Sequence, residues 1–82
     1  MPEETEKIIV ENQTSEDVEI YYMYHKTEHY LNTVNYNDTK EIYVSLNTLY
    51  FARGKRTNKD YGSRTFEKVP SYIHDKQTWV IR

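Results

Sequence analysis

The feature that most constrains this chain is a two-residue alternation of apolar and polar side chains. The segment DVEIYYMY places four apolar or aromatic residues on one side of an extended chain: Val18, Ile20, Tyr22 and Tyr24. The segment EIYVSL does the same with Ile42, Val44 and Leu46. Successive side chains of a β-strand point to opposite faces, so this period indicates half-buried strands. No stretch of ten residues carries a clear helical stripe, and the sequence therefore predicts an all-β fold.

Seven strands are expected, with these rough bounds: 6–12, 17–25, 29–35, 40–46, 48–54, 63–69 and 77–82. Short strands about 8 to 12 residues apart are typical of a sandwich or a barrel. Barrels usually need glycines or bulges at their corners, and both glycines of this chain lie at one loop. An open, mainly antiparallel two-sheet sandwich is therefore favoured over a barrel. The residues expected to face inward are Ile8, Val10, Val18, Ile20, Tyr22, Ile42, Val44, Leu46, Leu49, Phe51, Phe66, Trp79 and Ile81.

The 82 residues suit one domain, with residues 1–5 as a flexible acidic tail and residues 6–82 as the sandwich. The absence of cysteine excludes disulfides and thiolate chemistry. The opening MPEETEK lacks the basic and apolar regions of a signal peptide. No apolar run approaches the roughly 20 residues of a membrane-spanning helix, so we expect no membrane insertion. A native Met1 would indicate the cytoplasm, whereas an excised domain would indicate the cell envelope or a secreted protein.

Charge is unevenly distributed along the chain. Residues 1–20 carry seven acids against one lysine, whereas residues 53–68 carry six bases against two acids. This asymmetry indicates either a polar surface for a partner or attraction between the two segments within the fold.

The basic segment contains the loop 53–64, in which Gly54 and Gly62 bracket KRTNKDY. Glycine at each end permits positive φ, which would let a strand turn out into a loop and return. One hypothesis is a site for nucleic acid, another anion or an acidic protein face, because Lys and Arg neutralise phosphates and aromatic rings stack on bases. The alternative is a solvated hairpin tip whose charges discourage edge-to-edge association. The candidate residues are Arg53, Lys55, Arg56, Lys59, Tyr61 and Arg64.

Catalytic and metal-binding patterns are weak. No serine lies in a nucleophile-elbow sequence, and there is no phosphate-cradling glycine motif, so we expect no enzyme activity and no cofactor. His25 and His29 flank KTE, which as a three-residue hairpin loop would place the two imidazoles opposite each other. A zinc ion would need further ligands, for which His74 and Asp75 are the obvious candidates. Exposed turn histidines are the default interpretation.

The nine tyrosines cannot all point into one small core. Tyr21, with Met23 and Tyr43, is expected to form an exposed aromatic surface or a cross-strand ladder that covers a sheet. Such a surface would suit contact with a protein or a carbohydrate, because tyrosine is enriched where contacts form. Two glycosylation triplets, Asn12-Gln13-Thr14 and Asn37-Asp38-Thr39, would matter only in a eukaryotic secretory setting.

The order of IIVENQTSEDVEIYY, LNTV, LYFARGK and a late TWVIR resembles small bacterial immunoglobulin-like sandwich domains. Many of these are attached to cell-envelope proteins. The resemblance implies an immunoglobulin-like sandwich and specifies no functional residue. We predict a non-enzymatic protein-interaction module, with nucleic-acid or anion binding through residues 53–64 as the first alternative. Carbohydrate binding through a Tyr and Trp surface is the second.

Overall fold

The computed structural model describes residues 4–68 and 77–82, and these residues form seven strands and no helix. The strands are β1 (Thr5–Asn12), β2 (Val18–Tyr24), β3 (Thr27–Val34), β4 (Thr39–Ser45), β5 (Leu49–Gly54), β6 (Asp60–Thr65) and β7 (Thr78–Ile81). All seven predicted strands are therefore present. The largest displacement is at β6, for which 63–69 was predicted. The described residues contain no helix able to cross a membrane.

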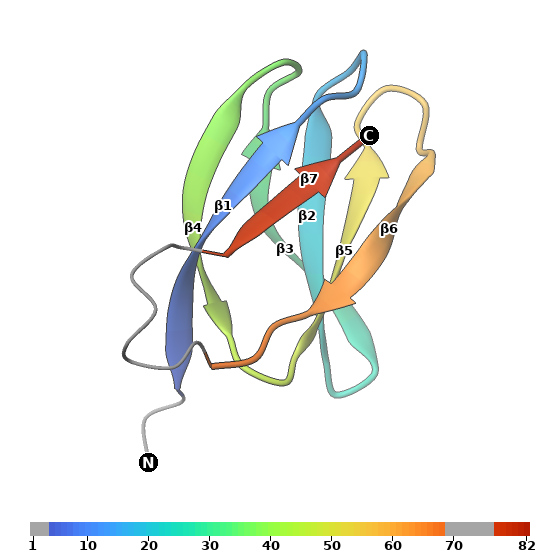
Figure 1. Ribbon diagram of the computed structural model, residues 1–82. Coiled ribbons are helices and arrows are strands. Elements are labelled where there is room, and N and C mark those ends of the chain that lie inside the picture. Colours follow the sequence, from blue (N-terminus) through green and yellow to red (C-terminus); the bar gives the residue numbers. More distant parts are fainter. Residues whose placement is uncertain (1–3, 69–76) are drawn as a thin grey trace.

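The strands form two sheets, and the three-stranded sheet β4-β1-β7 lies in front of the four-stranded sheet β3-β2-β5-β6 in Figure 1. Within the three-stranded sheet, β1 pairs antiparallel with β4 and parallel with β7. The pairing of β1 with β7 makes the first and last strands of the chain neighbours. This arrangement confirms the all-β, sandwich-type prediction, while the immunoglobulin-like assignment within that class stays a prediction.

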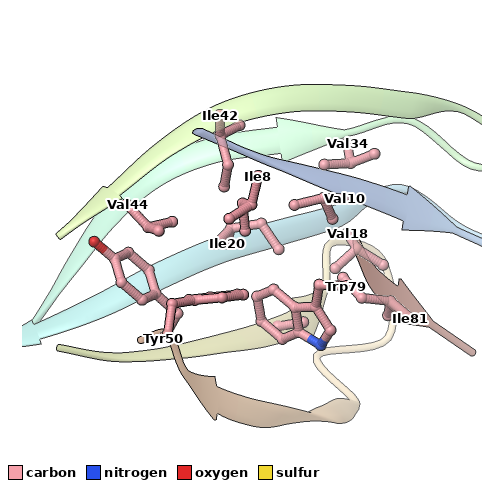
Figure 2. Packing of buried hydrophobic residues seen from close by; sticks show 12 residues of the cluster. Ile8, Val10, Val18, Ile20, Val34, Ile42, Val44, Tyr50, Trp79 and Ile81 are labelled. Atoms are coloured by element: carbon pink, nitrogen blue, oxygen red, sulfur yellow. The ribbon is translucent and has the colours of Figure 1, made fainter. Parts of the chain in front are cut away.

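The core lies between the sheets and is built from the alternating residues of β1, β2 and β4 together with an aromatic cluster (Figure 2). Phe66 is fully buried, and its ring makes edge-to-face contacts with Tyr50 and Trp79 at centroid distances of 5.8 and 5.9 Å. Each such aromatic pair contributes about 0.5–1.5 kcal/mol beyond the area it buries. Phe66 therefore links β5 to β7 across the interior.

The predicted inward side of β5 is wrong. Leu49 is 43% exposed and Phe51 is half-buried, whereas Tyr50 and Ala52 face the core. The strand lies centrally between β2 and β6, and it carries apolar residues on both faces. In such a strand the sequence pattern does not show which face is buried, because both faces carry apolar residues. Tyr22 and Leu46 are partly buried against the core, at its margin.

The β2–β3 hairpin has a two-residue turn rather than the predicted three-residue loop KTE. Tyr24 pairs with Thr27, and the turn residues His25 and Lys26 have φ values of 50° and 62°. Positive φ at both central residues is the backbone geometry of a type I′ turn, which fits the twist of a hairpin. Positive φ also occurs at three asparagines, a residue type that tolerates it: Asn37, Asn47 and Asn58.

A buried asparagine joins the two sheets at the end of β1. The Asn12 side-chain nitrogen donates to the carbonyl oxygens of Glu16 and Val34, each at 2.9 Å. Its oxygen accepts hydrogen bonds from the backbone N–H and the hydroxyl of Thr14, at 2.9 and 2.7 Å. Asn12 is 1% exposed, so the Asn12-Gln13-Thr14 triplet has a structural explanation in this turn.

Candidate functional site

The basic loop folds around an acidic side chain of the chain itself. The Glu16 carboxylate accepts hydrogen bonds from the backbone N–H groups of Arg56 and Thr57, at 2.9 and 3.0 Å. It also accepts from the hydroxyls of Thr57 and Tyr61. Glu16 is 5% exposed, so these four donors satisfy a carboxylate that has little contact with water. The acidic and basic segments thus meet at this residue, through backbone N–H and hydroxyl donors to Glu16 rather than through a Lys or Arg side chain.

The same hydrogen bonds shift the pKa values of two side chains, Glu16 and Tyr61. Thr57, Tyr61 and Arg56 stabilise the ionised carboxylate and lower the pKa of Glu16 to about 2, although desolvation opposes them. The hydrogen bond to Glu16 raises the pKa of Tyr61, because the phenol must stay protonated to donate. Glu16 is therefore ionised at neutral pH and occupies the backbone N–H groups of Arg56 and Thr57, which an external anion would otherwise contact.

The two glycines of this loop have different roles, and positive φ applies only to Gly62. Gly62 has a φ of 108°, and a Cβ there would meet no atom within 4 Å. A Cβ on Gly54 would instead lie 2.6 Å from the Glu16 carboxyl carbon. Gly54 is required because the carboxylate approaches its backbone closely.

Two of the predicted basic residues point away from the loop tip. An Arg53 guanidinium nitrogen lies 3.1 Å from a Glu28 carboxylate oxygen, and an Arg64 guanidinium nitrogen donates to the Thr78 carbonyl at 2.9 Å. Lys59 covers the Tyr61 ring, with its ammonium 5.2 Å from the centroid. The exposed cations left at the tip are Lys55, Arg56 and Lys59.

Arg53 instead belongs to a surface on the outward side of the four-stranded sheet. Tyr21 stacks on Phe51 with a centroid distance of 5.5 Å, and it meets Tyr30 edge-on at 6.0 Å. The Arg53 guanidinium lies over both the Tyr21 and Phe51 rings, at 5.0 and 5.4 Å. These rings cross β3, β2 and β5 as a ladder, which is one of the two arrangements predicted for Tyr21, although its partners are Tyr30 and Phe51 rather than Met23 and Tyr43.

Beside this ladder the surface is hollowed. The hollow has a volume of ≈ 600 Å³, and its apolar walls are Met23, Leu49 and Phe51. Its charged walls are Glu28, Arg53 and Asp60. The outer aromatic face is defined here as Tyr21, Met23, Tyr30, Leu49, Phe51 and Arg53. Leu49 and Phe51 were predicted to lie in the core and were therefore missed as surface residues. The apolar residues on both sides of β5 were the available signal.

Tyr43 does not share a surface with Tyr21. It lies on β4 in the other sheet, is 66% exposed, and has the Lys7 ammonium 5.8 Å from its ring centroid. The prediction of one aromatic surface containing both tyrosines is therefore wrong. Trp79 is 6% exposed and packs in the core, so it has no place in a Tyr and Trp binding surface.

Tyr43 instead contributes to a second hollow, of ≈ 370 Å³, whose lining residues come from both sheets. Two of them, Tyr24 and Thr48, adjoin the β2–β3 and β4–β5 turns, which lie at the bottom of Figure 1. The tyrosine cleft is defined by its lining residues: Tyr22, Tyr24, Leu31, Tyr43, Ser45, Thr48 and Tyr50. The basic loop lies at the opposite end of the molecule.

The histidines do not face each other across a hairpin loop. His25 is a turn residue and packs edge-on against the Tyr24 ring, whereas His29 pairs with Tyr22 on β2 and stacks on its ring. His74 and Asp75 lie outside the described residues. Within residues 4–68 and 77–82, no three side chains of His, Cys, Asp or Glu are grouped to hold a metal ion.

Comparison with known proteins identifies no family to which these surfaces could be related. No protein-family model matches the chain, and no curated protein matches it significantly.

Proposed function

We propose that this protein is a non-enzymatic interaction module that binds another protein through its outer aromatic face. The observation that carries the proposal is an apolar surface on the outward side of the four-stranded sheet. No described strand lies over this side, because the three-stranded sheet packs against the other one. Tyr30 is 55% exposed and Leu49 43%, so apolar area remains in water.

The composition of this face resembles that of protein interfaces. Interface centres are enriched in Tyr, Phe, Met and Arg and depleted of Lys. The outer aromatic face contains each of the enriched types and no lysine. Its Arg53 is held by Glu28 and by two rings, so it would lose little conformational freedom when a partner binds.

The charges around the hollow indicate what the partner presents. Glu28 and Asp60 contribute two negative charges against the single positive charge of Arg53. We therefore expect an apolar side chain in the hollow, between Met23 and Phe51, flanked by a Lys or Arg of the partner.

Substitutions within the outer aromatic face, compared with a control substitution at an exposed tyrosine outside it, test this proposal. A partner captured from the source organism should be purified, and its affinity for the isolated domain measured. Tyr30→Ala and Leu49→Asp should each weaken binding about tenfold or more, since truncation of a hot-spot residue at the centre of an interface costs about 2 kcal/mol or more. Tyr36→Ala is the matched control, because Tyr36 is 62% exposed in the β3–β4 connection. Equal affinities of the Tyr30 and Tyr36 variants would exclude the outer aromatic face.

A second candidate, nucleic-acid binding, rests on the exposed cations Lys55, Arg56 and Lys59. The neighbouring hollow is also lined by Glu16 and Asp17, which counteracts phosphate binding there. A labelled oligonucleotide titrated at two salt concentrations tests it, because phosphate contacts weaken steeply with salt. Binding that is absent at low salt, or unchanged when the three cations are reversed to Glu, would exclude this candidate.

A further inference from the structure

We infer that the tyrosine cleft is a binding site for a neutral carbohydrate unit. This inference is independent of the proposed protein contact, because the cleft shares no residue with the outer aromatic face. The walls of the cleft come from both sheets: Tyr22 and Leu31 from one, Tyr43 from the other.

The lining favours an uncharged ligand. The described residues that line the cleft include no Lys, Arg, Asp, Glu or His. The other hollows contain charged walls, such as Arg53 and Asp60 on the outer face or Lys55 and Asp17 beside the basic loop. A neutral ligand is therefore the best match for the tyrosine cleft.

The chemistry of the lining selects among neutral ligands. Four phenols, one serine and one threonine supply hydroxyl groups that both donate and accept hydrogen bonds. The tyrosine rings supply flat faces with negative potential, on which the polarised C–H groups of a sugar ring pack. A purely apolar ligand would offer no hydrogen bonds to the phenols of Tyr22, Tyr24 and Tyr43, whereas a polyhydroxylated ring supplies both hydrogen bonds and C–H groups. The volume of the tyrosine cleft, ≈ 370 Å³, falls at the lower end of the range for ligand sites, about 300–1,000 Å³.

The floor of the cleft is fixed before any ligand binds. Tyr50 is 3% exposed, and its hydroxyl oxygen accepts a hydrogen bond from the Ser45 N–H at 2.6 Å. Figure 2 shows this hydroxyl at the end of the core, beside Val44. Tyr22 is held between His29, with a centroid distance of 5.2 Å, and Tyr50, at 6.2 Å.

The mouth of the cleft includes Tyr24, which is 54% exposed and packs against the imidazoles of His25 and His29. Its ring is the natural surface for stacking, because it is accessible and yet held by two neighbours. Replacement of Tyr24 should therefore remove ligand contact with little disturbance of the core.

Amide-resolved NMR titration with neutral disaccharides tests the inference. The probes are maltose, cellobiose, lactose and N,N′-diacetylchitobiose, each raised above about 1 mM to reveal weak binding. At least one should give saturable shifts at Tyr22, Tyr24 and Thr48. Tyr24→Ala should weaken that binding about fivefold to tenfold, by loss of the ring contact, and Tyr24→Phe should weaken it less. The matched control Tyr36→Ala should leave it unchanged.

Three results would overturn the inference. These are silence across all four disaccharides, shifts confined to residues outside the cleft, and equal affinities of the Tyr24→Ala and Tyr36→Ala variants. Binding of an extended peptide to the cleft in place of every sugar would also overturn it. Leu49→Asp should leave sugar binding intact, so loss of the protein contact and loss of the sugar site are distinguishable.

Discussion

Replacement of Asn12 by alanine should be among the most damaging single changes in this domain. Asn12 is 1% exposed at the end of β1, and its amide nitrogen is the donor for two carbonyl oxygens on other segments. One belongs to Glu16 in the β1–β2 connection and the other to Val34 at the end of β3. Alanine would leave both acceptors in the interior without this donor.

The expected loss follows from those two acceptors. A buried polar group that loses its partner costs about 1–3 kcal/mol, so two such groups cost roughly 3 kcal/mol together. Domains of this size have a free energy of unfolding of about 0.05–0.15 kcal/mol per residue, or about 4–12 kcal/mol for the 82 residues. The substitution would therefore remove a quarter or more of the stability. The melting temperature should fall by about 12–24 °C, at about 4–8 °C per kcal/mol.

Urea unfolding followed by tryptophan fluorescence measures this loss directly. Trp79 is the single tryptophan of the chain and is buried, so its emission reports on the core. Asn12→Asp keeps the side-chain volume but removes the donor, and it should cost at least as much as Asn12→Ala. Asn35→Ala removes an exposed amide in the β3–β4 connection and should change stability by less than about 0.5 kcal/mol. If Asn12→Ala costs no more than Asn35→Ala, the proposed link between the sheets is refuted.

Three further predictions concern the anchor of the basic loop. The pKa of Glu16 is lowered from 4.5 to about 2, so its stabilisation is complete above pH 4.5 and is lost as the pH falls toward 2. Urea midpoints measured across that range should fall more steeply in the wild type than in Glu16→Gln, and equal slopes would contradict this assignment. Gly54→Ala should also flatten the slope, because its Cβ displaces the carboxylate; a wild-type slope would show that the carboxylate is not displaced. Gly62→Ala should cost about 1–3 kcal/mol of stability through its positive φ but keep the wild-type slope, and an unchanged urea midpoint would show that no strain arises.

The strands were predictable because their signal is local. Alternation in β2 and β4 requires only neighbouring residues, and both strands have the predicted side buried. The β2–β3 turn was not predictable in the same way. Its positive φ values fall on His25 and Lys26, which have no strong preference for that conformation, so a glycine-based or asparagine-based turn rule does not find them.

The anchor of the basic loop shows a different limit. The charge asymmetry indicated that the acidic and basic segments could attract each other, and the structure brings them together at Glu16, where the donors are backbone N–H and hydroxyl groups. The sequence could not single out Glu16 among seven acids, because its partners lie 40 to 45 residues away along the chain. Such a contact depends on how the β1–β2 and β5–β6 connections meet at one end of the sandwich. Only the arrangement of the strands determines that.

The outer aromatic face illustrates why a functional surface can be hidden within a correctly predicted strand. β5 was predicted at almost its observed bounds, yet Leu49 and Phe51 were assigned to the wrong side. If the apolar residues of a strand are all assumed to be buried, the sequence of β5 does not show which of its two sides faces the core. The sandwich has a single interior, and on β5 it is Tyr50 and Ala52 that face it. The apolar residues on the other side of β5 therefore need a different explanation. The ladder with Tyr21 accounts for part of Phe51, but it leaves Leu49 and Tyr30 exposed to water. That residual exposure is what a bound partner would remove.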